Sequence, residues 1–142
     1  MTWLLDTNIL SEVRKGPRCH PNVAAWWAGV NDDEIFLSVL TLGEIRQGIE
    51  RVRPRDPAKA DALDRWLREV TVGFSGRIIG VDAPVAEAWG RLVVRRSVPA
   101  IDALLAATAL VHGLALVTRN TVDVSGLGIA TLNPFEGAAG RT

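Results

Sequence analysis

The chain is poor in the residues that build disulfides, zinc sites and membrane spans. Its single cysteine, Cys19, excludes an intramolecular disulfide and argues against a cysteine-based zinc site, although the adjacent His20 leaves a thiol role open. No run of 18 apolar residues occurs, and the N-terminus lacks the basic segment of a signal peptide. We therefore expect a soluble, cytoplasmic protein.

The chain also lacks an excess of charge of either sign. It has 16 basic and 16 acidic residues, which excludes the strong sequence-independent attraction of a very basic nucleic-acid binder. A local basic groove is still compatible with this balance. Nearly all the basic residues are arginine, which suits bidentate contacts to phosphate but also follows from a GC-rich genome. Glycine-rich phosphate loops of the GxGxxG and GxxxxGK[ST] types are absent, which argues against a nucleotide cofactor.

What the chain does have is enough apolar material for one core. It contains 142 residues, of which 48% are hydrophobic, and this length suits a single domain over residues 1–142. Apolar runs of strand length alternate with amphipathic or apolar stretches of helix length. The pattern predicts strands at 2–6, 35–39, 77–81, 114–118 and 128–132, and helices at 8–15, 21–29, 42–52, 58–70, 84–96 and 100–112.

This alternation predicts an α/β fold in three layers, with a central, mainly parallel sheet of four or five strands flanked by helices. In such sheets ligands bind beyond the carboxyl ends of the strands. Residue Asp6 lies there by position, as do residues 38–44 and 118–123.

Three isolated acids stand near these predicted strand ends, and each also has an ordinary structural interpretation. Asp6 precedes a helix, where aspartate is a preferred N-cap. Glu44 follows Thr41 in the pattern of a capping box. Asp102 lies in the first turn of a helix, where the helix dipole favours a negative charge.

The combination favours a metal site. The helix that begins beside Asp102 is almost wholly apolar, so its carboxylate should be partly buried, and an unpartnered buried charge is costly. Two carboxylates about 4 Å apart repel each other by roughly 4 kcal/mol at an effective dielectric of 20. A hard divalent cation such as Mg²⁺ would relieve that repulsion with an all-oxygen ligand set. Neither His20 nor His112 has an evident place in it.

Four blocks in order carry a family resemblance: residues 4–8 (LLDTN), 37–44 (LSVLTLGE), 99–109 (PAIDALLAATA) and 117–120 (VTRN). Together they resemble the PIN domain, and more narrowly the VapC toxins of bacterial toxin–antitoxin pairs, including the FitB-like subgroup. The resemblance covers essentially the whole chain. It implies a PIN-like fold and a hydrolase that cleaves RNA with Mg²⁺, or alternatively Mn²⁺, held by clustered acids.

By motif position the resemblance implies that Asp6, Glu44 and Asp102 are the metal ligands and catalytic acids. The fourth family position is often aspartate and is Asn120 here, so Asp123 is an alternative source of that charge, and one or two metals remain open. The hydroxyls of Thr7 and Thr118 are candidates to contact a phosphate or an acid. Either Glu44 or Asp102 would orient the attacking water. Candidate groove arginines, each also interpretable as a solvated or structural side chain, are Arg14, Arg46, Arg95, Arg96 and, best placed, Arg119.

The resemblance further implies a homodimer silenced by a VapB-type antitoxin, with RNA as the substrate and DNA contacted only through the antitoxin. The tryptophans Trp26, Trp27, Trp66 and Trp89 are candidates for these interfaces or, alternatively, for the core. A second hypothesis is a catalytically impaired PIN-fold binding subunit of a DNA-bound regulatory complex, which Asn120 keeps open. A haloacid-dehalogenase-type phosphatase is disfavoured, because residues 6–8 lack the second aspartate of a DxD loop.

Overall fold

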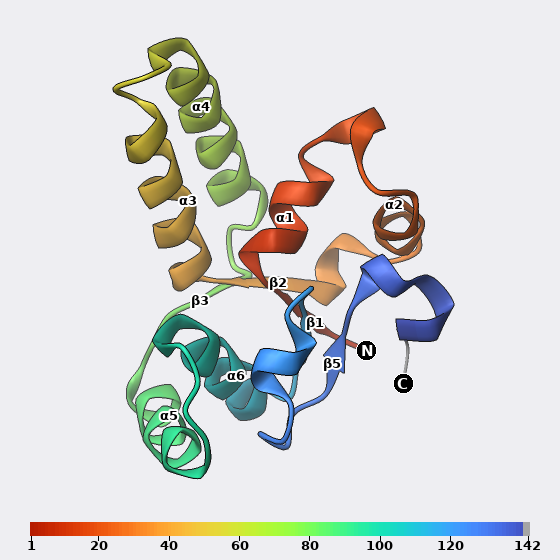
Figure 1. The fold of residues 1–142 in the computed structure, drawn as a ribbon, viewed down its shortest axis with the longest axis vertical. Helices are drawn as coiled ribbons and strands as arrows, with labels where there is room; N and C mark the ends of the chain where they lie inside the picture. Colours follow the sequence, from red (N-terminus) through yellow and green to blue (C-terminus); the bar gives the residue numbers. More distant parts are fainter. Residues whose placement is uncertain (141–142) are drawn as a thin grey trace.

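The computed structural model describes residues 1–140, which fold around one parallel sheet of five strands. The strand order is β3-β2-β1-β4-β5, and every neighbouring pair runs parallel. Figure 1 shows the sheet between the helices. The strands are β1 (Trp3–Leu5), β2 (Ile35–Ser38), β3 (Ile78–Ile79), β4 (Ala115–Val117) and β5 (Thr131–Leu132). The predicted three-layer α/β fold is confirmed.

The helices connect the strands and cover the sheet. They are α1 (Thr7–Val13), α2 (Pro21–Ala28), α3 (Val39–Val52), α4 (Pro57–Gly73), α5 (Ala83–Arg95) and α6 (Ala100–His112). Short 3₁₀ turns are η1 (Gly16–Arg18), η2 (Asp32–Glu34), η3 (Thr121–Val124) and η4 (Pro134–Gly140). Among the described residues no helix combines the length and the apolarity that crossing a membrane requires.

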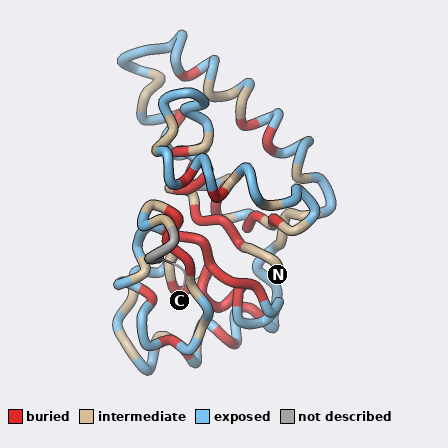
Figure 2. Tube along the Cα trace, turned by 90° about the vertical axis from the view of Figure 1, so that its right-hand side faces the viewer, coloured by how far each residue is buried: buried red, intermediate tan, exposed pale blue. Residues whose placement is uncertain are grey.

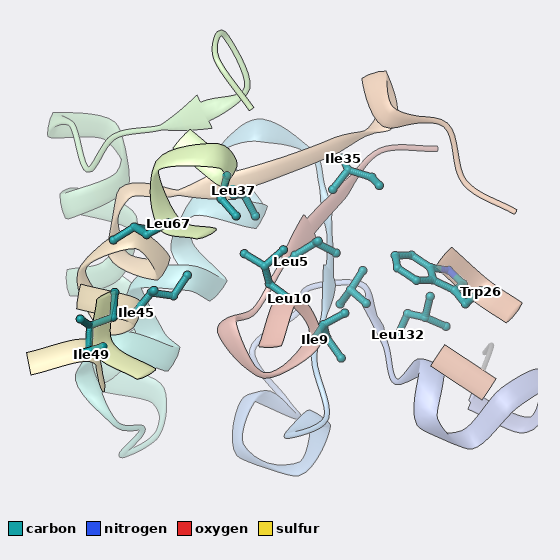
Figure 3. Close-up of a cluster of buried hydrophobic side chains, with 13 residues drawn as sticks. Leu5, Ile9, Leu10, Trp26, Ile35, Leu37, Ile45, Ile49, Leu67 and Leu132 are labelled. Atoms are coloured by element: carbon teal, nitrogen blue, oxygen red, sulfur yellow. The ribbon is translucent and has the colours of Figure 1, made fainter. Parts of the chain in front are cut away.

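Successive strand residues face opposite sides of the sheet, and each side has its own core. Leu5 and Val117 belong to a cluster with side chains of α1 to α4, whereas Leu4 and Leu116 pack with α5 and α6. This is the period-two alternation of a strand buried on both faces. Figure 2 shows the buried strands through the middle of the molecule, and Figure 3 shows the first cluster, in which Leu5 lies near Leu10.

The strand order reverses beside β1. The chain passes from β1 to β2 and β3 on one side, and later returns to place β4 and β5 on the other. A crevice forms at the carboxyl ends of strands on either side of such a switch point, because the connections leave in opposite directions. Asp6 follows β1 at this point and Thr118 follows β4.

Most element ends shift by one to three residues from the sequence prediction, and two of these differences have a local cause. Helix α3 begins at Val39 rather than at residue 42, because the Ser38 hydroxyl caps it by accepting the Leu40 backbone N–H at 3.0 Å. Strand β5 is shorter than predicted, because Gly128 has a φ of 78°, a left-handed conformation that an extended strand cannot contain.

Candidate active site

Asp6 is the buried centre of the candidate site. It is 6% exposed, and its carboxylate accepts the Thr7 backbone N–H at 2.7 Å and the Thr118 hydroxyl at 2.8 Å. Burial raises the pKa of the Asp6 carboxyl, and the bonds from Thr118 and Thr7 oppose that shift. Asp6 is also the N-cap of α1. The structural and functional interpretations of Asp6 are therefore compatible.

Glu44 lies in α3, and its carboxylate reaches the start of α1, beside Asp6. The Thr7 hydroxyl donates to Glu44 Oε1 at 2.6 Å, across 37 residues of sequence. The capping box predicted for Glu44 and Thr41 is wrong, because Ser38 caps this helix and Thr41 lies inside it. The Glu44 carboxylate therefore does not cap the start of α3, and it points toward α1 instead.

Asp102 completes a group of interacting acids. It occupies the first turn of α6 and is half-buried. The pKa of the Asp102 carboxyl is raised, first by burial and then by the negative charges of Asp6, Asp123 and Glu44. None of these four acids takes part in an ion pair among residues 1–140. Their mutual repulsion is thus not offset by an ion pair with a base.

The remaining predicted site residues lie around this group. Asn120 is exposed, and its backbone N–H donates to the Thr118 hydroxyl at 3.0 Å. Asp123 is exposed in η3, where its backbone carbonyl accepts from Arg96 at 3.1 Å. Both threonine hydroxyls, at 7 and 118, contact acids in this structure.

The candidate arginines separate into engaged and open side chains. Arg46 pairs with Glu50 and Asp64, and the Arg14 guanidinium lies 5.5 Å from the centre of the Trp66 ring. These contacts identify both as structural. Arg96 donates hydrogen bonds to the backbone carbonyls of Asp123 and Ser125. Arg95 and Arg119 are exposed.

A divalent metal fits the donor chemistry of the site. The side chains that interact are carboxylates, which are hard oxygen ligands of the kind that Mg²⁺ and Mn²⁺ prefer. Across residues 1–140, no three acidic, histidine or cysteine side chains are packed closely enough to form a preassembled ion cluster. Asp6, Glu44 and Asp102 therefore influence one another through their charges rather than through contact, and an ion would draw them together.

Most of the chain matches a known family. A family model of the PIN domain covers residues 3–122. The chain belongs to the PIN-domain family. Among curated PIN relatives, the toxin FitB of Neisseria gonorrhoeae is 30% identical over 138 residues, which cover 93% of this chain and 97% of FitB. The VapC ribonuclease Y4jK of Sinorhizobium fredii is 28% identical over 140 residues, which cover 95% and 99% of the two chains.

Solved PIN structures give the same assignment. The structure of FitAB bound to an IR36 DNA fragment superposes with a TM-score of 0.84 at 28% identity, over 94% of this chain and 96% of that one. A toxin–antitoxin complex from Klebsiella pneumoniae superposes with a TM-score of 0.72 at 27% identity, over 94% and 98%. The predicted resemblance to this family is confirmed.

Sequence reasoning missed one residue at the rim of the PIN site, Phe135. Its ring centre lies 4.4 Å from the guanidinium carbon of Arg119. No periodicity or motif marks a single aromatic that follows the last strand. Most of the four candidate tryptophans belong to the core. Trp26 is buried, and Trp27 and Trp66 pack against the first cluster, whereas Trp89 is exposed, at 36%.

Proposed function

We propose that this PIN-domain chain is a metal-dependent endoribonuclease toxin of the VapC type, silenced by a cognate VapB-type antitoxin. The observation that carries the proposal is Asp102, whose pKa is raised by burial and by the charges of three further carboxylates, none of which is in an ion pair among residues 1–140. Four interacting negative charges at a switch point favour a cation. The similarity to a VapC ribonuclease and to a toxin–antitoxin complex supports RNA as the substrate and an antitoxin as the partner.

In this proposal Asp6, Glu44 and Asp102 hold Mg²⁺ or Mn²⁺. The ion, when bound, supplies Lewis acidity that polarises a phosphate and lowers the pKa of a water. Asn120 offers a neutral carbonyl oxygen beside these acids, and Asp123 offers a further negative charge. The choice between them decides whether the site takes one ion or two.

The protein's own groups prepare the acids for this chemistry. Thr118 and the Thr7 N–H each bond one oxygen of Asp6, so its carboxylate is fixed in one orientation. The Thr7 hydroxyl fixes Glu44 in the same way. Either Glu44 or Asp102 would orient a water and accept its proton during attack on phosphorus.

The partners follow from the same proposal. The antitoxin covers the crevice and keeps RNA from the acids, and contact with DNA comes only through the antitoxin. The toxin itself forms a homodimer, which sedimentation of the purified chain measures directly.

The test compares RNA cleavage by the wild type, Asp6→Asn and Asp33→Asn. Asp33 is an exposed aspartate in η2, before the amino end of β2. Asp33→Asn therefore removes the same charge as Asp6→Asn, but at a position far from the candidate site. We expect the wild type and Asp33→Asn to cleave RNA with Mg²⁺ and not with EDTA, to arrest growth, and to be silenced by the antitoxin. Asp6→Asn should lose cleavage and restore growth.

One observation favours a second candidate function, a catalytically impaired binding subunit of a DNA-bound complex. Asn120 carries no charge where the family often has an aspartate, and a similar chain occurs in the structure of FitAB bound to DNA. This candidate predicts that the metal-loaded, antitoxin-free chain cleaves no RNA, while the chain with its antitoxin binds DNA. Cleavage mapped across total RNA after brief expression separates the two functions.

A further inference from the structure

Arg119 lies next to the acids but is not one of the groups that hold them. It directly follows Thr118, and its backbone N–H donates to Asn8 Oδ1 at 3.3 Å. The amide nitrogen of the same Asn8 lies 3.4 Å from Asp6 Oδ2, as a donor to it. Asn8 therefore ties the backbone of Arg119 to the carboxylate of Asp6, and places the arginine beside that acid.

The guanidinium of Arg119 lies against an aromatic ring. Its central carbon is 4.4 Å from the centre of the Phe135 ring, within the range of a cation–π contact. Within residues 1–140 no hydrogen bond or ion pair uses the guanidinium of Arg119, so its N–H groups are available to a ligand. We call the pair the Arg119–Phe135 platform.

Phe135 is itself held in place from several directions. Its backbone N–H donates to Asn133 Oδ1 at 3.0 Å, and its carbonyl accepts from the Asn22 side chain at 2.8 Å. The His20 ring meets it edge-on at 5.3 Å. These contacts join η4 to the start of α2, and Figure 1 shows the two segments together. The ring is thus a fixed support, so the arginine that rests on it is preorganised.

The charge of Arg119 is not neutralised by a neighbouring acid. The side-chain ion pairs among residues 1–140 use Lys15, Arg46 and Arg53 as their basic partners. An exposed, oriented guanidinium without a carboxylate is suited to a phosphate, which it binds through two parallel N–H bonds. The acids nearby would otherwise repel a nucleic acid strand.

We propose that the Arg119–Phe135 platform binds a backbone phosphate of single-stranded RNA beside the bond that the acids cleave, with Phe135 as the residue that positions Arg119. The inference rests on the proposed function for the location of the cleaved bond. It adds a phosphate subsite and a positioning residue outside the carboxylate group.

The test measures binding of a short fluorescent single-stranded RNA in EDTA, where cleavage is suppressed, across a series of salt concentrations. Arg119→Ala should weaken binding about tenfold, because a charged hydrogen-bonding group is lost. The slope of log affinity against log salt should fall by about 0.7, the value for one phosphate contact of a single strand. Arg55→Ala is the matched control, since Arg55 is exposed in the turn between α3 and α4, at the far end of their hairpin in Figure 1.

Phe135→Leu separates positioning from charge. It keeps every positive charge, so the salt slope should stay near that of the wild type while affinity falls about threefold, as expected for a lost exposed cation–π contact. The same substitution should change nothing further in an Arg119→Ala background. A purely structural role for Phe135 would instead lower RNA affinity equally in both backgrounds, together with the melting temperature.

The outcomes separate this inference from the proposed function. Unchanged RNA affinity in Arg119→Ala would overturn the phosphate subsite even if the wild type cleaves RNA. Arg119 would then be assigned to contact with an acidic protein partner. Failure of the wild type to bind RNA would overturn it as well. Binding that depends on Arg119 and Phe135 without cleavage in Mg²⁺ or Mn²⁺ would support the subsite and contradict the nuclease function.

Discussion

The Thr118 hydroxyl donates a hydrogen bond of 2.8 Å to Asp6 Oδ2, joining two residues that are 112 positions apart in the sequence. Both follow the carboxyl ends of neighbouring parallel strands, β1 and β4. Both are buried, at 6% for Asp6 and 1% for Thr118. The bond therefore fixes Asp6, the buried acid of the candidate site, from across the switch point.

Removing this hydroxyl should impair the site more than the fold. Thr118→Val keeps the shape of the side chain but leaves Asp6 Oδ2 with only the 3.4 Å bond from Asn8 Nδ2. Loss of a group that orients a metal ligand typically lowers metal affinity or activity 10- to 100-fold. We expect RNA cleavage to fall in that range, with the metal concentration for half-maximal cleavage raised. Thr118→Ser retains the donor and should stay near wild type. Equal activity of the valine and wild-type proteins would show that the bond does not orient the acid.

Thr41 offers a test of stability that is separate from the site. It is fully buried, and its hydroxyl is the one buried side-chain polar atom of the described residues without a hydrogen-bond partner. An unsatisfied buried hydroxyl costs about 1–3 kcal/mol, so replacement by an apolar group of the same shape removes that cost. Thr41→Val should raise the free energy of unfolding by about 1 kcal/mol in urea titrations. A loss of stability would mean that the hydroxyl has a partner in solution.

Glu12 gives a dependence of stability on pH. Its carboxylate accepts from Lys15 Nζ and from the His20 backbone N–H, both at 2.9 Å. These bonds, that of Lys15 first, lower the pKa of Glu12. The folded pKa lies below the unfolded value, so the stabilisation is present above the unfolded pKa of about 4.3 and is lost as pH falls through the folded pKa.

Glu12→Gln should therefore destabilise the protein at neutral pH, and the difference from wild type should shrink in acid. Urea unfolding of both proteins at about pH 7 and about pH 3 measures this, on either side of the ordinary glutamate pKa. A constant difference at both values would contradict the role of the charge.

Most of the fold follows from local patterns in the sequence. Each of the five predicted strands and six predicted helices is present, and α6 has the bounds that the pattern predicts. The start of α3 differs from the prediction, because Ser38 and Thr41 are both good N-caps and Val39 favours a strand when considered alone. Tertiary packing chooses between the two caps, and the local sequence carries no information about that choice.

The sequence predicts which acids lie at the candidate site, but not the hydrogen bonds that hold them in place. The positions of Asp6, Glu44 and Asp102 follow from strand ends and from the family motif. The bonds from Thr7 to Glu44 and from Thr118 to Asp6 join distant segments, so local spacing could suggest only that these hydroxyls meet a phosphate or an acid. The contact of Phe135 with Arg119 has no sequence signal at all.

The central claim is that Asp6, Glu44 and Asp102 together hold a divalent cation, and Mn²⁺ binding followed by electron paramagnetic resonance tests it most directly. Titration of the purified chain should show saturable binding of Mn²⁺ that Mg²⁺ displaces. Asp102→Asn should weaken that affinity at least tenfold at a melting temperature no lower than that of the wild type, whereas Asp33→Asn should leave the affinity as in the wild type. Absence of saturable Mn²⁺ binding by the wild type, or equal affinity in Asp102→Asn, would contradict the account.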